Sequence, residues 1–321
     1  MLQRRAFLCG LAGTAYGLPA RAQLASQRPI KLVIPGGAGG PADVLARVIA
    51  QHLRSTSGLT AIIENYSGGG GRLAARSVAR SDPDGHTLLF GNTTVFSVLP
   101  VAAKNAGYDL SRDFQVIAKV ADGFQVLIVA ADSSARSVAD LIQHAKAHPS
   151  ALNVAVIPGA IPHLAAELLK LRAGIDLVHI PYKSEAESIG AVLSGQVQLC
   201  FVNVATILPL IAEGRVRALG VTSAARQPDL AGVPTMIEGG LTDYIVTSFF
   251  GVAAPAKTPA DVIAQLNSAI NRVLRLPDVQ ESLAKLGVLP ASTTPKEFEE
   301  FVEAETQKWS AVVKASGFKL D

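Results

Sequence analysis

The sequence predicts an α/β protein of two domains, each a parallel-rich mixed sheet flanked by helices. Short apolar runs rich in β-branched residues alternate with segments whose apolar residues recur at three- and four-residue spacing. Continuous apolar strands separated by helices are typical of parallel sheets that are covered on both faces. The 321 residues exceed the length of one typical domain, about 100–200 residues. A hydrophobic content of 49 % is ordinary for a globular core.

The apolar runs place nine expected strands along the chain. Helical periodicity fills most of the intervals between them, as in residues 42–53 and 137–148. After residue 255 helical signals dominate, and Thr294 followed by Glu297 forms a capping box for the last helix. The expected strands are residues 30–35, 60–65, 86–92, 115–120, 124–131, 152–157, 177–181, 197–203 and 216–223.

No linker-like segment separates the two domains. We therefore expect the chain to cross between them more than once, near residues 124–131 and 247–255, where the strand–helix alternation changes character. The predicted division has a first lobe of residues 28–125 plus 248–321 and a second lobe of residues 126–247.

Residues 1–22 have the features of an export signal. Arg4 and Arg5 precede a short apolar run, and Ala20-Arg21-Ala22 provides a small-x-small cleavage site. The apolar run of residues 6–18 is shorter than the roughly 20 residues that span a bilayer. Arg-Arg-Ala-Phe-Leu also fits the twin-arginine pattern, so the export route stays open. We expect a periplasmic protein cleaved near Ala22.

The charge and cysteine content exclude several classes of function. Loss of residues 1–22 removes three arginines and no acid, so the formal charge falls from +3 to zero. Nucleic-acid binding then lacks its electrostatic basis, and no polybasic patch favours a membrane surface. Cys200 is the single cysteine after the signal and lies in an apolar strand, which predicts a buried small hydrophobe.

A glycine-rich loop joins the first expected strand to its helix in "IKLVIPGGAGGPAD". The first amides of a helix lack internal partners and, with the helix dipole, favour an anion. The segment therefore predicts an anion-binding loop, with a tight strand-to-helix turn as the simpler interpretation. Its candidate ligand-binding residues are Gly36, Gly37, Ala38, Gly39, Gly40 and Asp43.

The same loop partly matches a dinucleotide fingerprint. Gly37 and Gly39 have the required spacing, Ala42 stands at the third position, and Glu64 ends the next strand. Pro41 inside the motif and the export signal argue against this assignment. An exported enzyme using an anionic cofactor or substrate remains the alternative to a binding protein.

A second glycine cluster, residues 68–71, again follows a strand and precedes a helix. Two such junctions at neighbouring strand ends indicate a binding edge more strongly than one does. This cluster adds Gly69 as a candidate, and the polar residues after the third strand add Asn92 and Thr93.

Several segments resemble the Bug family of periplasmic receptors for tripartite tricarboxylate transporters. They include "IKLVIPGGAGGPADVLAR", "IIENYSGGGGRLAARSVARSDPDGHTLLFGN", "VHIPYKS", "LSGQVQLCFVN" and "FFGVAAPAKTP". The resemblance implies a type II periplasmic binding protein, with two lobes joined by a hinge of two crossings. It also implies a small-molecule ligand, usually an organic carboxylate, held in the interlobe cleft, and transporter subunits in the membrane as partners. We expect a monomer that binds without catalysis.

The resemblance places the second half of the site in the second lobe, where this chain departs from the family pattern. The family loop usually reads S-S-G-N-G-S-x-x-H, whereas "AVIPGAIPH" retains only Gly159 and His163 and has no serine. Lost hydroxyls remove hydrogen-bond partners, each worth about 0.5–1.5 kcal/mol. We therefore expect a ligand with one anionic or polar end at residues 36–40 and an apolar or aromatic body against Ile157, Pro158 and Ile161. The candidates in this lobe are Ile157, Pro158, Gly159, Ala160, His163, Tyr182 and Asn203.

Two pairs of potential metal ligands, one of two histidines and one of a histidine and a glutamate, have spacing that can hold a metal ion. His163 and Glu167 lie one helical turn apart, as do His144 and His148. Neither pair has a visible third ligand in the sequence. The sequence therefore predicts no metal site, no cofactor and no catalytic residue.

Overall fold

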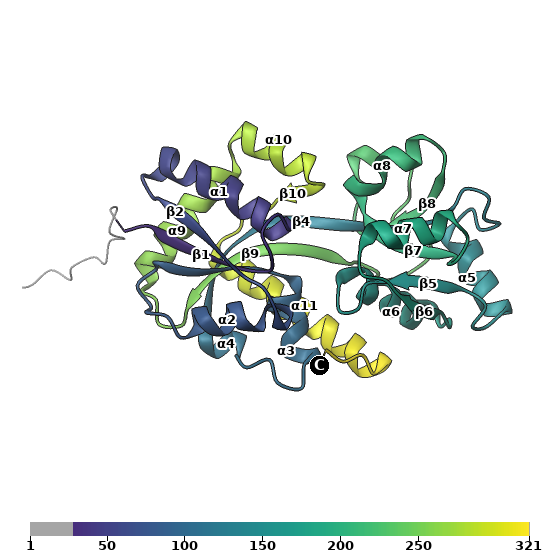
Figure 1. The fold of residues 1–321 in the computed structure, drawn as a ribbon, viewed down its shortest axis with the longest axis horizontal. Coiled ribbons are helices and arrows are strands. Elements are labelled where there is room, and N and C mark those ends of the chain that lie inside the picture. Colours follow the sequence, from purple (N-terminus) through teal and green to yellow (C-terminus); the bar gives the residue numbers. More distant parts are fainter. Residues whose placement is uncertain (1–27, 321) are drawn as a thin grey trace, which may run out of the picture.

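The computed structural model describes residues 28–320, and the predicted signal, residues 1–22, lies outside them. Two α/β lobes are joined by the long strands β4 (Phe114–Ala130) and β9 (Thr247–Pro255) (Figure 1). The predicted α/β fold class, with mixed sheets flanked by helices, is confirmed. Within residues 28–320 no helix is long and apolar enough to cross a membrane.

In the first lobe a parallel group of three strands meets the two connecting strands. The central strand β1 (Ile30–Pro35) pairs in parallel with β2 (Ala61–Tyr66) and with β3 (Thr87–Asn92). β9 is antiparallel to β3 and to β4. The short strand β10 (Val288–Pro290) pairs with β4.

Helices cover both faces of this first sheet. One apolar cluster lies under α1, α9 and α10, and the other lies under α2 and the start of α11. The helical segments of this lobe are α1 (Pro41–Ser57), η1 (Gly69–Gly71), α2 (Arg72–Ala79), the π-helical turn η2 (Thr94–Val98), α3 (Leu99–Ala102), α4 (Leu110–Asp113), α9 (Ala260–Leu274) and α10 (Pro277–Lys285).

The second lobe is built around the distal half of β4. From Gln125 onward β4 pairs with β7 (Leu199–Asn203) and β8 (Val216–Val221), both antiparallel to it. β5 (Asn153–Val156) lies between β7 and β6 (Val178–Pro181) and is parallel to both. Helices α5 (Val138–Ala147) and α6 (Ile161–Ala173) contribute to one apolar cluster, and α7 (Glu185–Leu193) and α8 (Val204–Ala212) to the other. The turn η3 (Pro228–Leu230) follows β8.

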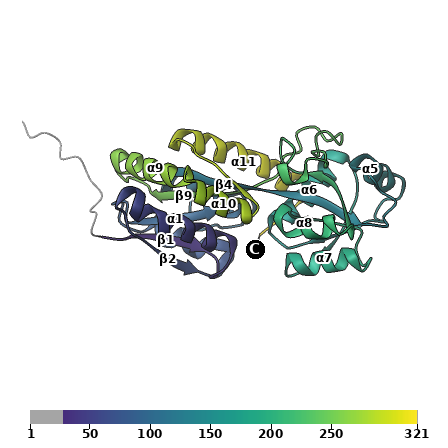
Figure 2. The same ribbon diagram turned by 90° about the horizontal axis from the view of Figure 1, so that it is seen from above.

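The last helix, α11 (Pro295–Ser316), packs against both lobes (Figure 2). The predicted capping box at its start is confirmed, because Thr294 and Glu297 bond each other's backbone amides. Phe298 belongs to an apolar cluster of the first lobe, whereas Trp309 belongs to a cluster of the second. The predicted lobe division, which assigns all of residues 248–321 to the first lobe, stays a prediction; the structure adds that α11 contributes to both cores.

The structure differs from the sequence expectation in the connecting region. Residues 115–120 and 124–131, expected as two strands, form the single strand β4. Asp122 and Gly123 resemble a turn locally, but they pair with β9 on one side and with β10 on the other. The expected crossing at residues 247–255 is itself strand β9, and the apolar runs did not indicate β10.

Candidate functional site

A cleft of about 700 Å³ lies between the two lobes and is the candidate ligand site. Half of the predicted site residues line it, from both lobes. A smaller cavity of about 370 Å³ under α11 contains none of them. The predicted residues in the cleft lining are Gly36, Gly37, Gly39, Gly40, Asn92, Ile157, Ala160 and Asn203.

The glycine loop in the cleft is held by its own hydrogen bonds. The Gly36 amide donates to the carbonyls of Ile34 (3.0 Å) and Tyr66 (3.1 Å), and the Gly40 amide donates to the Gly37 carbonyl at 3.4 Å. Gly39 has a φ of +80°, a backbone conformation that favours glycine. Two loop amides are therefore already paired. The first-turn amides of α1 after Pro41, which have no acceptor within the helix, are further candidate donors for a ligand.

Asp43 does not line the cleft but holds this loop through a hydrogen bond to its backbone. Its side chain is 2 % exposed and accepts a hydrogen bond from the Gly39 amide at 2.9 Å. Arg47 pairs with both carboxylate oxygens, at 2.9 and 3.0 Å. Mainly because of this guanidinium, the pKa of Asp43 is lowered to about 2. The charge of Asp43 is thus compensated by Arg47, and its bond to the Gly39 amide holds the loop in this conformation without a ligand.

Three helix N-termini of the second lobe face the same cleft. β5, β6 and β7 run in parallel, so the helices that follow them begin at one edge of the sheet. Ala160, Ser184 and Asn203 are the N-cap residues of α6, α7 and α8. The predicted apolar wall is present in part: Ile157, Ala160, Ile161 and Pro162 line the cleft, whereas Pro158 does not.

The sequence reasoning missed several polar residues of the cleft lining. Glu185 is the one carboxylate among the lining residues described, and Lys285 is the one amine. Glu185 accepts from the backbone amide of Asn203 and from the Thr206 hydroxyl, and burial raises its pKa. Gln125, 4 % exposed, also lines the cleft. Glu185 is the first residue of α7, and no sequence signal showed that it faces the cleft.

The other predicted site residues lie outside the cleft lining. Ala38 is exposed on its loop and Gly69 at the start of η1, and Tyr182 packs against the apolar cluster beneath α7 and α8. Gly159 has a φ of +77°, and a Cβ at this position would lie 2.6 Å from Leu320 Cδ2. For these residues, as for Asp43, Thr93, Pro158 and His163, direct ligand contact stays a prediction.

His163 belongs to a cluster whose third member the sequence did not reveal. Glu167 Oε1 lies 3.8 Å from His163 Nε2 and 3.3 Å from Nδ1 of His179, which comes from β6. Burial lowers the pKa of His179 to about 4, lowers that of His163 and raises that of Glu167. The three side chains offer ligand atoms within 4.8 Å of one another and could hold a metal ion. None of them lines the cleft.

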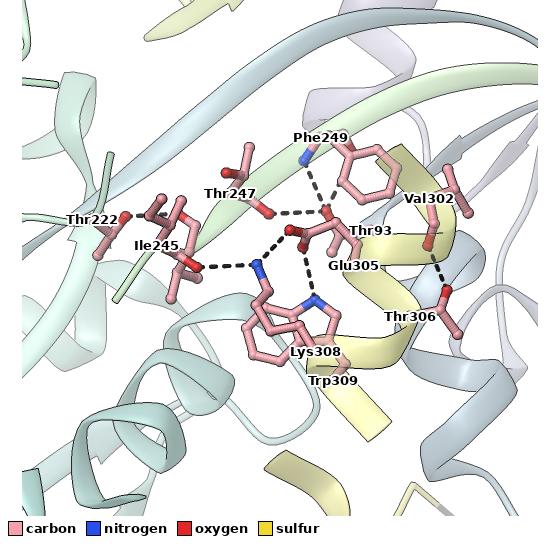
Figure 3. Close-up of polar contacts among 11 residues, drawn as sticks. Thr93, Thr222, Ile245, Thr247, Phe249, Val302, Glu305, Thr306, Lys308 and Trp309 are labelled. Atoms are coloured by element: carbon pink, nitrogen blue, oxygen red, sulfur yellow. Dashed lines mark hydrogen bonds and ion pairs between the residues drawn. The ribbon is translucent and has the colours of Figure 1, made fainter. Parts of the chain in front are cut away.

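Two buried threonines clamp the connecting strands on either side of the crossing (Figure 3). The Thr93 hydroxyl accepts from the Phe249 amide at 2.8 Å and lies 3.3 Å from the Thr247 carbonyl. On the second-lobe side, Thr222 accepts from the Gln125 amide at 2.9 Å and donates to the Val246 carbonyl at 2.7 Å. The chain is therefore held from the second lobe at Val246 and from the first lobe at Thr247 and Phe249, so this step into β9 is one of the two crossings at which we expect the hinge.

Helix α11 adds a polar contact beside the hinge. Glu305, 7 % exposed, accepts from the Trp309 indole nitrogen at 3.1 Å and pairs with Lys308. The Lys308 ammonium also donates to the Ile245 carbonyl at 3.0 Å (Figure 3). This network ties the middle of α11 to the strand segment that enters β9.

Comparisons with known proteins agree with this geometry. The family model "Tripartite tricarboxylate transporter family receptor" matches residues 45–318. Protein BugT of Bordetella pertussis is 32 % identical, covering 97 % of this chain and 96 % of its own. Two solved Rhodopseudomonas palustris structures superpose well: Rpa4515 with adipate (33 % identity, TM-score 0.77, covering 91 % and 98 % of the two chains) and MatC with bound malate (30 %, 0.74, 89 % and 99 %).

The relatives match 89–97 % of this chain, and the family model extends over residues from both lobes. The family consists of solute-binding receptors and not of enzymes. The chain therefore belongs to the tripartite tricarboxylate transporter receptors, the Bug family, and is a solute-binding protein.

Proposed function

We propose that this receptor captures a small organic acid in the interlobe cleft and delivers it to membrane subunits of a tripartite tricarboxylate-type transporter. The observation that carries the proposal is the cleft of about 700 Å³, in which the α1 loop of one lobe faces the α6, α7 and α8 N-termini of the other. Helix N-termini favour anionic groups. Adipate and malate, bound by the two structural relatives, are both small carboxylates.

One end of the acid binds at the loop of residues 36–40, beside the first turn of α1. Its body lies against the apolar wall that Ile157 and Ile161 form. A ligand that touches both lobes stabilises the closed arrangement by its differential affinity for it. Rotation about the hinge at residues 246–247 then presents a new surface to the membrane subunits. The export signal and a periplasmic location, as a monomer, are part of the same proposal.

The test is calorimetric titration of the mature protein, residues 23–321, with mono- and dicarboxylates of increasing chain length. Scattering measurements should show a smaller radius of gyration with the acid that binds. Ala160→Phe fills the cleft and should abolish binding. Ala212→Phe, at the exposed far end of α8, is the matched control and should bind like the wild type. Binding that survives Ala160→Phe, or a nucleotide that copurifies with the protein, would contradict the proposal.

A further inference from the structure

One of the three helix N-termini of the second lobe, that of α8, already holds a carboxylate of the chain itself. Asn203 is the N-cap of α8, and its backbone amide donates to Glu185 Oε1. The Thr206 hydroxyl, from the first turn of α8, donates to Glu185 Oε2 at 3.3 Å. These donors and the α8 dipole are the groups that would otherwise receive an anionic end of a ligand. Glu185 therefore occupies the α8 N-terminus, one of the positions that a second ligand carboxylate could take.

Glu185 can accept further hydrogen bonds from donors on a ligand. An ionised carboxylate is an acceptor only, with about four lone-pair positions, and two are used here. A second carboxylate placed beside it would meet a like charge. The one amine in the lining, Lys285, is largely exposed and pairs with Glu281 at 2.8 Å, so it does not offset Glu185.

A second polar group in the cleft has the same requirement. Gln125 lies where β4 enters the second lobe and is 4 % exposed. Its side-chain oxygen is buried and has no hydrogen-bond partner within the described residues. A buried acceptor without a partner is costly. A rotation of the Gln125 side chain that brings this oxygen to the cleft would let an N–H donor of a bound ligand satisfy it, as one would satisfy the Glu185 carboxylate.

We propose that Glu185 sets the ligand class: the receptor prefers carboxylic acids whose far end carries an amine or a primary amide, and it discriminates against dicarboxylates. This inference rests on the proposed function, since it assumes that the acid end binds at the α1 loop. The ligand then has two unlike ends, a carboxylate for the amides of the first lobe and an N–H donor for the acceptors of the second.

The experiment uses acids that share a chain and differ at one end. The six-carbon set is adipate, adipamate, 6-aminohexanoate and hexanoate, and the four-carbon set is succinate, succinamate, 4-aminobutanoate and butanoate. Titrations are done at pH 8, because burial raises the pKa of Glu185 and an alkaline pH favours its ionised form. Because hydrogen bonds to a charged group are strong, we expect the amide or amine to bind about 10- to 100-fold more tightly than the dicarboxylate in at least one set.

Glu185→Gln keeps an acceptor for the Asn203 amide and removes the charge. In this variant the preference over the dicarboxylate should fall by about tenfold or reverse. Glu187→Gln, on the same helix but outside the cleft lining, is the matched control and should keep the wild-type order. Circular dichroism verifies that both variants fold. If one variant does not fold, the order of affinities measured with the wild-type protein decides between the two ligand classes. A wild type that prefers adipate or succinate overturns this inference and leaves the proposed function intact, whereas a wild type that binds no acid overturns both.

Discussion

Thr93 and Thr94 are adjacent, but the structure gives them opposite roles. The Thr93 hydroxyl is buried, 1 % exposed, and holds β9 at the hinge through the Phe249 amide. Thr94 lines the cleft. The substitutions Thr93→Val and Thr94→Val keep the branched shape and remove one hydroxyl each. They therefore separate a structural contribution from a contribution to binding.

The magnitude for Thr93→Val follows from the groups left without partners. The variant leaves the buried Phe249 N–H without its acceptor at 2.8 Å and the Thr247 carbonyl without a donor at 3.3 Å. A buried polar group that loses its partner costs about 1–3 kcal/mol. Since natural domains unfold with about 5–15 kcal/mol, a loss of this size is readily measured. Thr94→Val should change the free energy of unfolding by about 0.5 kcal/mol or less, as is usual away from such features.

Urea unfolding measured by tryptophan fluorescence gives the first quantity, because Trp309 is the single tryptophan and is fully buried. Titration of the folded variants with the acid that binds gives the second. We expect Thr93→Val to keep the wild-type affinity, and Thr94→Val to lose about two- to tenfold, the value of one hydrogen bond. A stable Thr93→Val variant that no longer binds would refute the hinge assignment and support the prediction that Thr93 contacts the ligand.

Three further predictions concern stability. Burial lowers the pKa of His179 to about 4, whereas in the unfolded chain it is about 6.5. As the pH falls from 7 to 5, His179 is therefore protonated in the unfolded chain but stays neutral in the folded protein, which lowers the free energy of unfolding. Over this range His179→Gln should lose about 1–2 kcal/mol less stability than the wild type in urea titrations. Asp43→Asn should lower the free energy of unfolding by about 1–2 kcal/mol at pH 7, since the pKa of Asp43 is lowered to about 2 in the fold. The stability difference between variant and wild type should become smaller below pH 4, where the carboxyl is protonated in the unfolded chain but still ionised in the folded protein. Gly251→Ala would place a Cβ 2.6 Å from the Phe298 ring atom Cε1 and should cost about 1–3 kcal/mol in thermal unfolding, whereas Gly190→Ala, with open space around it, should not.

Much of the fold could be predicted because its signals are local. The first strand is found at residues 30–35, as expected, and the capping box of Thr294 and Glu297 opens α11. β4 could not be predicted as one strand, because Asp122 and Gly123 are turn formers whose conformation is set by pairing with distant strands. The dual packing of α11 was equally unpredictable, since an amphipathic pattern shows which face is buried and not which lobe buries it.

The site was predictable only where backbone shape decides it. Glycines after a strand marked the loop that lines the cleft, but polar side chains that act through tertiary contacts gave no such signal. His179 is separated from Glu167 in the sequence and meets it because β6 lies beside β5. From the sequence Glu185 is an ordinary acid at a helix start. Its position in the cleft depends on a hydrogen bond from the backbone amide of Asn203, a residue of the next strand.

Glu185 lies close to where the two lobes touch. A Cβ on Gly287, in the turn before β10, would approach Asn203 Oδ1 to 2.8 Å and would clash with Ala205, so the first lobe touches the start of α8. On the other side α11 joins both cores. The Glu185 carboxylate lines the cleft and is held there by the Asn203 amide and the Thr206 hydroxyl without a ligand. Because its position is already set, this carboxylate accepts a hydrogen bond from the preferred ligand with little loss of conformational entropy on binding. For the same reason it stays close to a second ligand carboxylate and repels it, so one residue both favours the preferred acid and disfavours its dicarboxylate analogue.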